Sequence, residues 1–127
     1  MVRVAQINLQ RKRTATLNLS RIMREGKCAI ALVQEPYFHK GDFYCGKLPN
    51  PTFVAFKKSG MRNPREMPRA CILANNAIEV CLLPEFTTRD ICSVMVNLRI
   101  GNSKKSTSTV QFIYHMMNQH QLVASIM

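Results

Sequence analysis

The sequence lacks any apolar run long enough to cross a membrane, and it also lacks a signal segment. Its longest apolar stretches, such as Ala29–Val33 and Val94–Val96, have the length of strands, whereas a membrane-spanning helix needs about 20 residues. The first residues, Met1–Gln6, contain no apolar signal core and no small-residue cleavage site. These absences predict a nuclear or cytoplasmic protein that is not secreted and has no membrane partner.

Cysteine pairs with the spacing of a metal site are missing as well. The five cysteines, one of them Cys45, include no Cys-x-x-Cys pair, and zinc sites and secreted disulfide frameworks are usually recognised by their spacing. The other four lie within apolar runs, which predicts reduced, buried thiols: Cys28, Cys71, Cys81 and Cys92.

Acidic residues are scarce, and the charge is therefore of one sign. Eighteen Lys and Arg residues against seven Asp and Glu residues give a formal net charge of +11. Basic chains are attracted to polyanions because binding to a phosphate backbone releases its condensed counterions. The composition favours a nucleic-acid partner, and the alternatives are a basic surface kept for solubility or a truncated chain that has lost its acidic half.

What is present is enough for one domain with a packed core, since 46% of the 127 residues are hydrophobic. An amphipathic helix is predicted over Thr14–Glu25, with Gly26 as its C-cap and Ala15, Leu19, Ile22 and Met23 on one face. A long loop is predicted over 37–51 and a turn over 101–106. Strands are predicted at 2–9, 28–34, 52–57, 69–74, 78–83, 90–100 and 109–115.

The order of strand, helix and strand at the start of the chain predicts an α/β fold. The segment Cys28–Gln34 is almost continuously apolar, which is typical of a central strand buried on both faces. We expect Ile30, Leu32, Ile72, Val94 and Val96 in the core, with a helix packed on the sheet.

Two polar residues, Asn8 and Glu35, end apolar strands. Ligand sites of open sheets gather at such strand ends, and a carboxylate there could bind a divalent cation that an amide helps to orient. Phosphodiester hydrolysis needs a metal and an activated water. The alternative is that Asn8 makes a local turn bond and that Glu35 is an exposed strand terminus.

These residues lie in motifs that resemble a known family. Gln6–Gln10, a helix, and Ile30–Pro36 with its Gln-Glu-Pro ending are similar to the opening of the endonuclease/exonuclease/phosphatase superfamily. Within it, Arg69–Ile72 and Leu82–Asp90 look like the apurinic-endonuclease-like endonuclease domain of non-LTR retrotransposons. The resemblance covers roughly residues 2–100 and implies a two-sheet α/β sandwich, of which this chain would be about the first half.

The resemblance also implies roles for three residues. Glu35 matches the glutamate that binds Mg²⁺ or Mn²⁺, and Asn8 matches the asparagine near the metal and the scissile phosphate. Tyr114 resembles the active-site tyrosine, although His115-Met116 departs from the branch where a proline usually follows. A core or edge-strand tyrosine is the alternative for Tyr114.

The later family motifs are absent from this chain. No aspartate follows Asp90, so neither the Asp-x-Asn motif nor the Asp-His pair of the family is present. We therefore expect residues 1–115 to form a partial endonuclease domain and 116–127 to be an unassigned tail. The parent polyprotein would carry a reverse transcriptase and would nick DNA to prime it.

Alternatives of other classes stay open. One is a non-catalytic nucleic-acid-binding module, supported by the charge and the basic loop Lys57–Arg65. However, no recognised binding motif is present, and aromatic residues are not interleaved with the basic ones as in stacking platforms. The other is a phosphatase of the same superfamily.

Overall fold

The first strand, the helix and the second strand form the α/β unit that their patterns predict. The computed structural model describes residues 3–40, 42–44, 48, 52–57, 67–76, 78–100 and 104–113, with the backbone alone for 98–100 and 104–113. Strand β1 (Val4–Asn8) leads into helix α1 (Arg13–Arg24), and strand β2 (Ile30–Gln34) returns parallel to β1. Parallel pairing places the carboxyl ends of both strands at one edge of the sheet.

Helix α1 buries a face that is rotated slightly from the predicted one. The buried positions are Thr16, Leu19, Ser20 and Met23, while Ala15 and Ile22 are half-buried. The two hydroxyls can be buried because Thr16 donates to the Lys12 carbonyl and Ser20 donates to the Thr16 carbonyl. No helix in the described part of the chain has both the length and the apolarity needed to cross a membrane.

Gly26 ends α1 as predicted. Its φ of +69° lies in the left-handed region, which glycine adopts without steric cost. The Gly26 amide donates to the Met23 carbonyl, and the Lys27 amide donates to the Ile22 carbonyl. These two bonds form a Schellman motif, which satisfies carbonyls that the helix end would otherwise leave unpaired.

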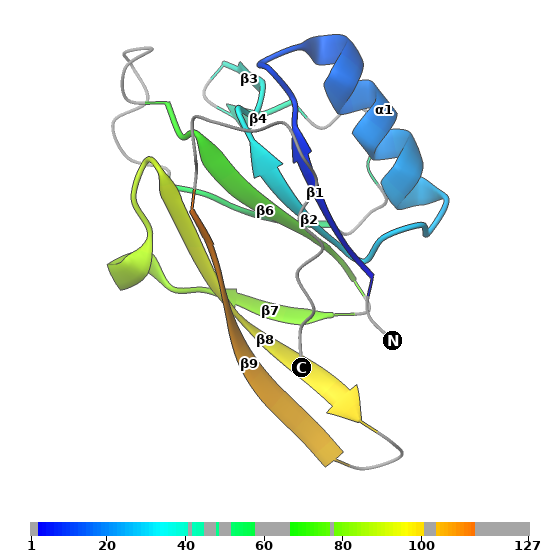
Figure 1. Cartoon of the computed structure of the whole chain (residues 1–127), viewed down its shortest axis with the longest axis vertical. Coiled ribbons are helices and arrows are strands. Elements are labelled where there is room, and N and C mark those ends of the chain that lie inside the picture. The colour runs from blue at the N-terminus through cyan, green and yellow to red at the C-terminus, as the bar shows by residue number, and fades with distance from the viewer. Residues whose placement is uncertain are drawn as a thin grey trace.

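Two sheets and the helix make three layers (Figure 1). The first sheet has the order β1-β2-β6-β5, with β5 (Thr52–Ala55) and β6 (Ala70–Asn75) antiparallel to each other. Strands β7 (Glu79–Leu82), β8 (Ile91–Ile100) and β9 (Lys104–Ile113) form the second, antiparallel sheet. Helix α1 covers the face of the first sheet that is turned away from the second.

The core lies on both sides of β2, as the apolar run predicts. Ile30 and Leu32 pack toward the second sheet, where Val94 and Val96 are fully buried. The alternate residues of β2, Ala31 and Val33, pack toward the helix, and every residue of β2 is buried. The predicted core residues Ile30, Leu32, Ile72, Val94 and Val96 are all confirmed as buried.

The predicted loop over 37–51 is wrong in its first part, because it contains a short hairpin. Strands β3 (Phe38–His39) and β4 (Asp42–Phe43) pair antiparallel. Their phenylalanine rings are buried in edge contact, with centroids 6.3 Å apart. Strands of two residues are too short to leave a periodic pattern in the sequence, so only their packing identifies them.

Two further differences concern the second sheet. Strand β9 begins at Lys104, within the segment 101–106 that was predicted as a turn, and pairs with β8 along ten residues of each strand. A 3₁₀ turn, η2 (Pro84–Phe86), follows β7 and was not predicted. Tyr114 and residues 116–127 lie outside the described residues.

The prediction that Cys81 is buried is also wrong. Cys81 is exposed, and along β7 the half-buried Val80 and Leu82 alternate with the exposed Glu79 and Cys81. The remaining described cysteines are buried: Cys28, Cys71 and Cys92. Cys45 lies outside the described residues. The apolar sequence around Cys81 hides this alternation because cysteine is itself counted as apolar.

The rate of thiol alkylation should therefore distinguish the exposed Cys81 from the buried cysteines. Burial raises the pKa of the Cys71 thiol well above its ordinary value and that of Cys92 to about 12, and a thiol with a raised pKa supplies little reactive thiolate at pH 8. We expect iodoacetamide to modify Cys81 first and to reach Cys71 and Cys92 only when the chain unfolds. Peptide mass spectrometry over time measures each site, and early modification of Cys71 in folded protein would contradict the burial.

Candidate functional site

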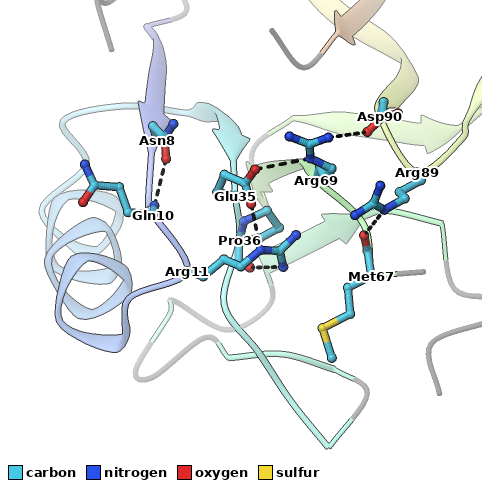
Figure 2. A network of polar contacts seen from close by, with 9 residues as sticks. All are labelled: Asn8, Gln10, Arg11, Glu35, Pro36, Met67, Arg69, Arg89 and Asp90. Atoms are coloured by element: carbon cyan, nitrogen blue, oxygen red, sulfur yellow. Dashed lines mark hydrogen bonds and ion pairs between the residues drawn. The ribbon is translucent and has the colours of Figure 1, made fainter. Parts of the chain in front are cut away.

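Asn8 and Glu35 lie side by side where the first two strands end. Asn8 pairs in register with Gln34, the last residue of β2, and Glu35 follows directly. The strands at whose ends the sequence places these two residues are therefore neighbours in the sheet. Figure 2 shows this edge, together with arginines from three other places in the sequence.

The side chain of Asn8 makes a local turn bond. Its Oδ1 accepts a hydrogen bond of 2.8 Å from the Gln10 amide. This bond supports a left-handed turn after β1, in which Gln10 has a φ of +51° and Arg11 a φ of +53°. The turn bond that was the alternative for Asn8 is present, and it leaves Asn8 pointing at its own turn (Figure 2).

The backbone of Glu35 joins three segments. Its amide donates to the Arg69 carbonyl at 3.0 Å, and its carbonyl accepts from the Arg11 amide at 2.9 Å. Glu35 has a φ of +48°, a left-handed conformation that costs a non-glycine residue free energy. Such a conformation persists where surrounding contacts enforce it, and here hydrogen bonds on both sides of the residue do so.

The carboxylate of Glu35 is held between two guanidinium groups. Oε2 lies 2.7 Å from Arg11 Nε, and Oε1 lies 3.3 Å from Arg69 Nε. The side chain of Glu35 is 17% exposed, so the alternative of an exposed strand terminus is wrong. Charge-assisted bonds of this kind are stronger than neutral ones, and water screens them less when they are partly buried.

The charge pattern continues to the second sheet. Arg69 Nη1 lies 3.8 Å from Asp90 Oδ1, which is an ion pair but too long for a hydrogen bond. Asp90 Oδ1 is shielded from solvent and accepts no hydrogen bond from the residues described here. Arg89 Nε donates to the Met67 carbonyl at 3.0 Å. Positive and negative groups therefore alternate from Arg11 through Glu35 and Arg69 to Asp90 (Figure 2).

The residues that the structure describes do not by themselves make a complete divalent-metal site. Mg²⁺ requires near-octahedral oxygen ligands and is held through carboxylates, waters and substrate phosphates. Both oxygens of Glu35 face arginines, and the described residues contain no group of three His, Cys, Asp or Glu side chains that could hold a metal. A divalent ion at Glu35 would have to displace a guanidinium and find its other ligands elsewhere.

Sequence reasoning found Asn8 and Glu35 but missed their partners. Arg11 is 24 positions from Glu35, and Arg69 is 34 positions beyond it, so no local spacing marks the pairs. Arg69 and Asp90 do fall in the segments that resemble the retrotransposon domain, which was the one signal available. Tyr114, the third predicted site residue, lies outside the described residues.

Comparison with known proteins agrees with the predicted resemblance. No family model matches the sequence, and no curated protein does. A solved structure, "Endonuclease domain of TRAS1, a telomere-specific non-LTR retrotransposon", is similar with a TM-score of 0.66 and 28% sequence identity. The similarity covers 91% of this chain and 45% of that structure, so this chain spans less than half of its length. The likeness to a non-LTR retrotransposon endonuclease domain and the partial α/β sandwich are both confirmed.

Proposed function

We propose that this chain is part of a nuclease domain that binds DNA and whose parent protein nicks DNA to prime reverse transcription. The observation that carries this is the 28% identity to a retrotransposon endonuclease over 91% of the chain. The placement of Asn8 and Glu35 at adjacent strand ends supports it. Residues 1–115 would belong to the nuclease fold and 116–127 would form a tail, in a protein of the nucleus or cytoplasm.

Mg²⁺ or Mn²⁺ would be the metal of the parent enzyme, with Glu35 as a ligand and with weak or absent binding in this chain. Tyr114 and Asn8 would contribute to the active site. In this chain Arg11 and Arg69 neutralise Glu35. The same two arginines would contact a phosphate if the Glu35 carboxylate bound another partner. The proposed role of Arg11 and Arg69 is to balance the negative charge at the strand ends.

A second candidate is a nucleic-acid-binding module without catalysis. It is favoured by the engagement of both Glu35 oxygens with arginine. The basic loop Lys57–Arg65 also suggested this module. Of that loop, the structure describes only Lys57. Both candidates predict DNA binding, and they differ in whether the chain cuts.

DNA binding itself can be measured by fluorescence anisotropy with a labelled duplex. We expect weak binding that is independent of sequence, because the net charge of +11 attracts phosphates without reading bases. If about four phosphates are neutralised, affinity should fall roughly 100-fold between about 50 and 200 mM salt. A duplex of unrelated sequence is the control. Affinity that does not change with salt, or no binding at low salt, would contradict the proposed function.

A further inference from the structure

A cluster of aromatic and basic side chains lies next to the strand-end site and takes no part in the ion pairs described above. It consists of Tyr37 and Tyr44 from the two ends of the β3–β4 hairpin and Arg13 from the first turn of α1. Tyr37 is two residues beyond Glu35, and the intervening Pro36 carbonyl lies 3.5 Å from Arg11 Nη1. The cluster is therefore continuous with the edge that carries Asn8 and Glu35.

The hairpin separates its four rings into two pairs. Phe38 and Phe43 pair across the strands and are buried in the core. Tyr37 and Tyr44 flank them, joined by a hydrogen bond of 2.9 Å from the Tyr44 amide to the Tyr37 carbonyl. Their own rings meet edge to face, with centroids 5.6 Å apart and planes at 79°. Both tyrosines are half-buried, unlike the two phenylalanines between them, which are buried.

Arg13 is oriented by Tyr44. Its Cζ lies 5.2 Å from the Tyr44 ring centroid, and its Nε donates to Tyr44 Oη at 3.0 Å. The two terminal nitrogens of Arg13 make no hydrogen bond with any residue that the structure describes. An oriented guanidinium with both terminal groups unused can bind phosphate in a bidentate manner.

Electrostatics give a further reason to seek a partner for this cluster. Arg11, Lys12 and Arg13 are consecutive at the start of α1, and the first turn contains no acidic residue. Cations are disfavoured at this end of a helix because the macrodipole is positive there. The arrangement is locally unfavourable in the free protein, and an anionic ligand would relieve it.

From this geometry we infer that Tyr37, Tyr44 and Arg13 bind an unpaired nucleotide of single-stranded DNA. The base would stack on the exposed part of the tyrosine rings, and the adjoining phosphate would bind the terminal nitrogens of Arg13. Base-paired DNA cannot offer a free base face, so the cluster distinguishes single strands from duplexes. This inference rests on the proposed function and adds that the chain prefers single-stranded DNA to duplex DNA.

The test compares the affinities of a labelled thymine 20-mer and a 20-base-pair duplex by anisotropy at one salt concentration. Tyr44→Ala should weaken binding of the single strand roughly five- to a hundred-fold, the range of one base stacked on an aromatic ring. Tyr44→Phe keeps the ring and should retain most of the preference for single strands. Arg13→Gln should also lower the ratio of single-strand to duplex affinity.

Arg24→Gln is the matched control, because it removes the same charge from the last turn of the same exposed helix surface. Arg24→Gln should weaken the binding of the single strand and of the duplex equally and only slightly. Equal effects of Arg13→Gln and Arg24→Gln on the affinity ratio would overturn the inference while leaving the proposed function intact. Absence of DNA binding by the unaltered chain would overturn both. If Tyr44→Ala does not fold, the arginine pair decides alone.

Discussion

Supercoiled plasmid incubated with the purified chain and Mg²⁺ or Mn²⁺ should stay uncut. Hydrolysis of a phosphodiester needs an activated water, neutralised charge at phosphorus and a stabilised leaving oxygen. Both oxygens of the Glu35 carboxylate face arginines, and the described residues contain no group of three His, Cys, Asp or Glu side chains that could hold a metal. No aspartate follows Asp90, so the family motifs that position the water and the phosphate are not in these 127 residues.

The assay should compare the chain with its Glu35→Ala variant, and a known metal-dependent nuclease should cut the same plasmid in parallel. We expect neither form of the chain to convert supercoiled plasmid to the nicked circle above the buffer background. Nicking that disappears in Glu35→Ala would mean that the residues present are sufficient for catalysis. Nicking that persists in Glu35→Ala would indicate a contaminating nuclease.

Replacing Glu35 by glutamine should measurably destabilise the fold. Glutamine has nearly the same shape but no charge, so Arg11 and Arg69 would lose their common anion at a partly buried place. Loss of a charge-assisted hydrogen bond costs about 2 kcal/mol, and more when a charge is left buried without a partner. Because Arg11 is about a third exposed, we expect a loss near 2 kcal/mol in total and a melting temperature lower by about 8 °C.

Glu25→Gln supplies the comparison. Glu25 also contacts two cations, Arg21 and Lys27, both at 3.1 Å, but on the open surface of the helix end. Exposed pairs contribute little because water and salt screen them, so this variant should melt close to the unaltered chain. Equal melting of the two variants, or a Glu35→Gln variant more stable than the original, would show that the arginines do not rely on Glu35. Thermal unfolding followed by circular dichroism measures all three.

The parts of the fold that followed from the sequence are those in which local pattern and tertiary packing agree. The run Cys28–Gln34 predicted a strand buried on both faces, and β2 is that strand. Gly26 predicted the end of α1, and its left-handed φ fulfils that role. In both places one short segment contains all the information, because burial or a backbone angle dictates the residue types.

The remainder depends on contacts between distant segments. Strand β9 begins with Lys104, Lys105 and Ser106, which have no apolar period, and it is a strand because β8 supplies its partners. The sequence likewise places Tyr37, Tyr44 and Arg13 in unrelated segments. Basic and aromatic residues that are not interleaved along the chain become neighbours only when the hairpin folds against the start of α1.

The candidate site shows the same division. A polar residue after each of two apolar strands was visible, and parallel pairing of those strands brings Asn8 and Glu35 together. Which charges would surround Glu35 was not visible, because the Arg11 and Arg69 contacts require the turn after β1 and the start of β6 to meet. The resemblance supplied a role for Glu35, but it did not supply these two partners.

The main-chain bonds at this edge have a consequence for how the site could be altered. The amide of Arg11 bonds to the Glu35 carbonyl, the amide of Glu35 to the Arg69 carbonyl, and the amide of Arg69 to the Arg89 carbonyl. Main-chain atoms form all three of these hydrogen bonds, so no side-chain atom takes part in them. The main chain thus sets the spacing of four positions from separate segments, and the side-chain ion pairs contribute stability in addition. A substitution such as Glu35→Gln should therefore lower the melting temperature while these main-chain hydrogen bonds keep positions 11, 35, 69 and 89 at the same spacing.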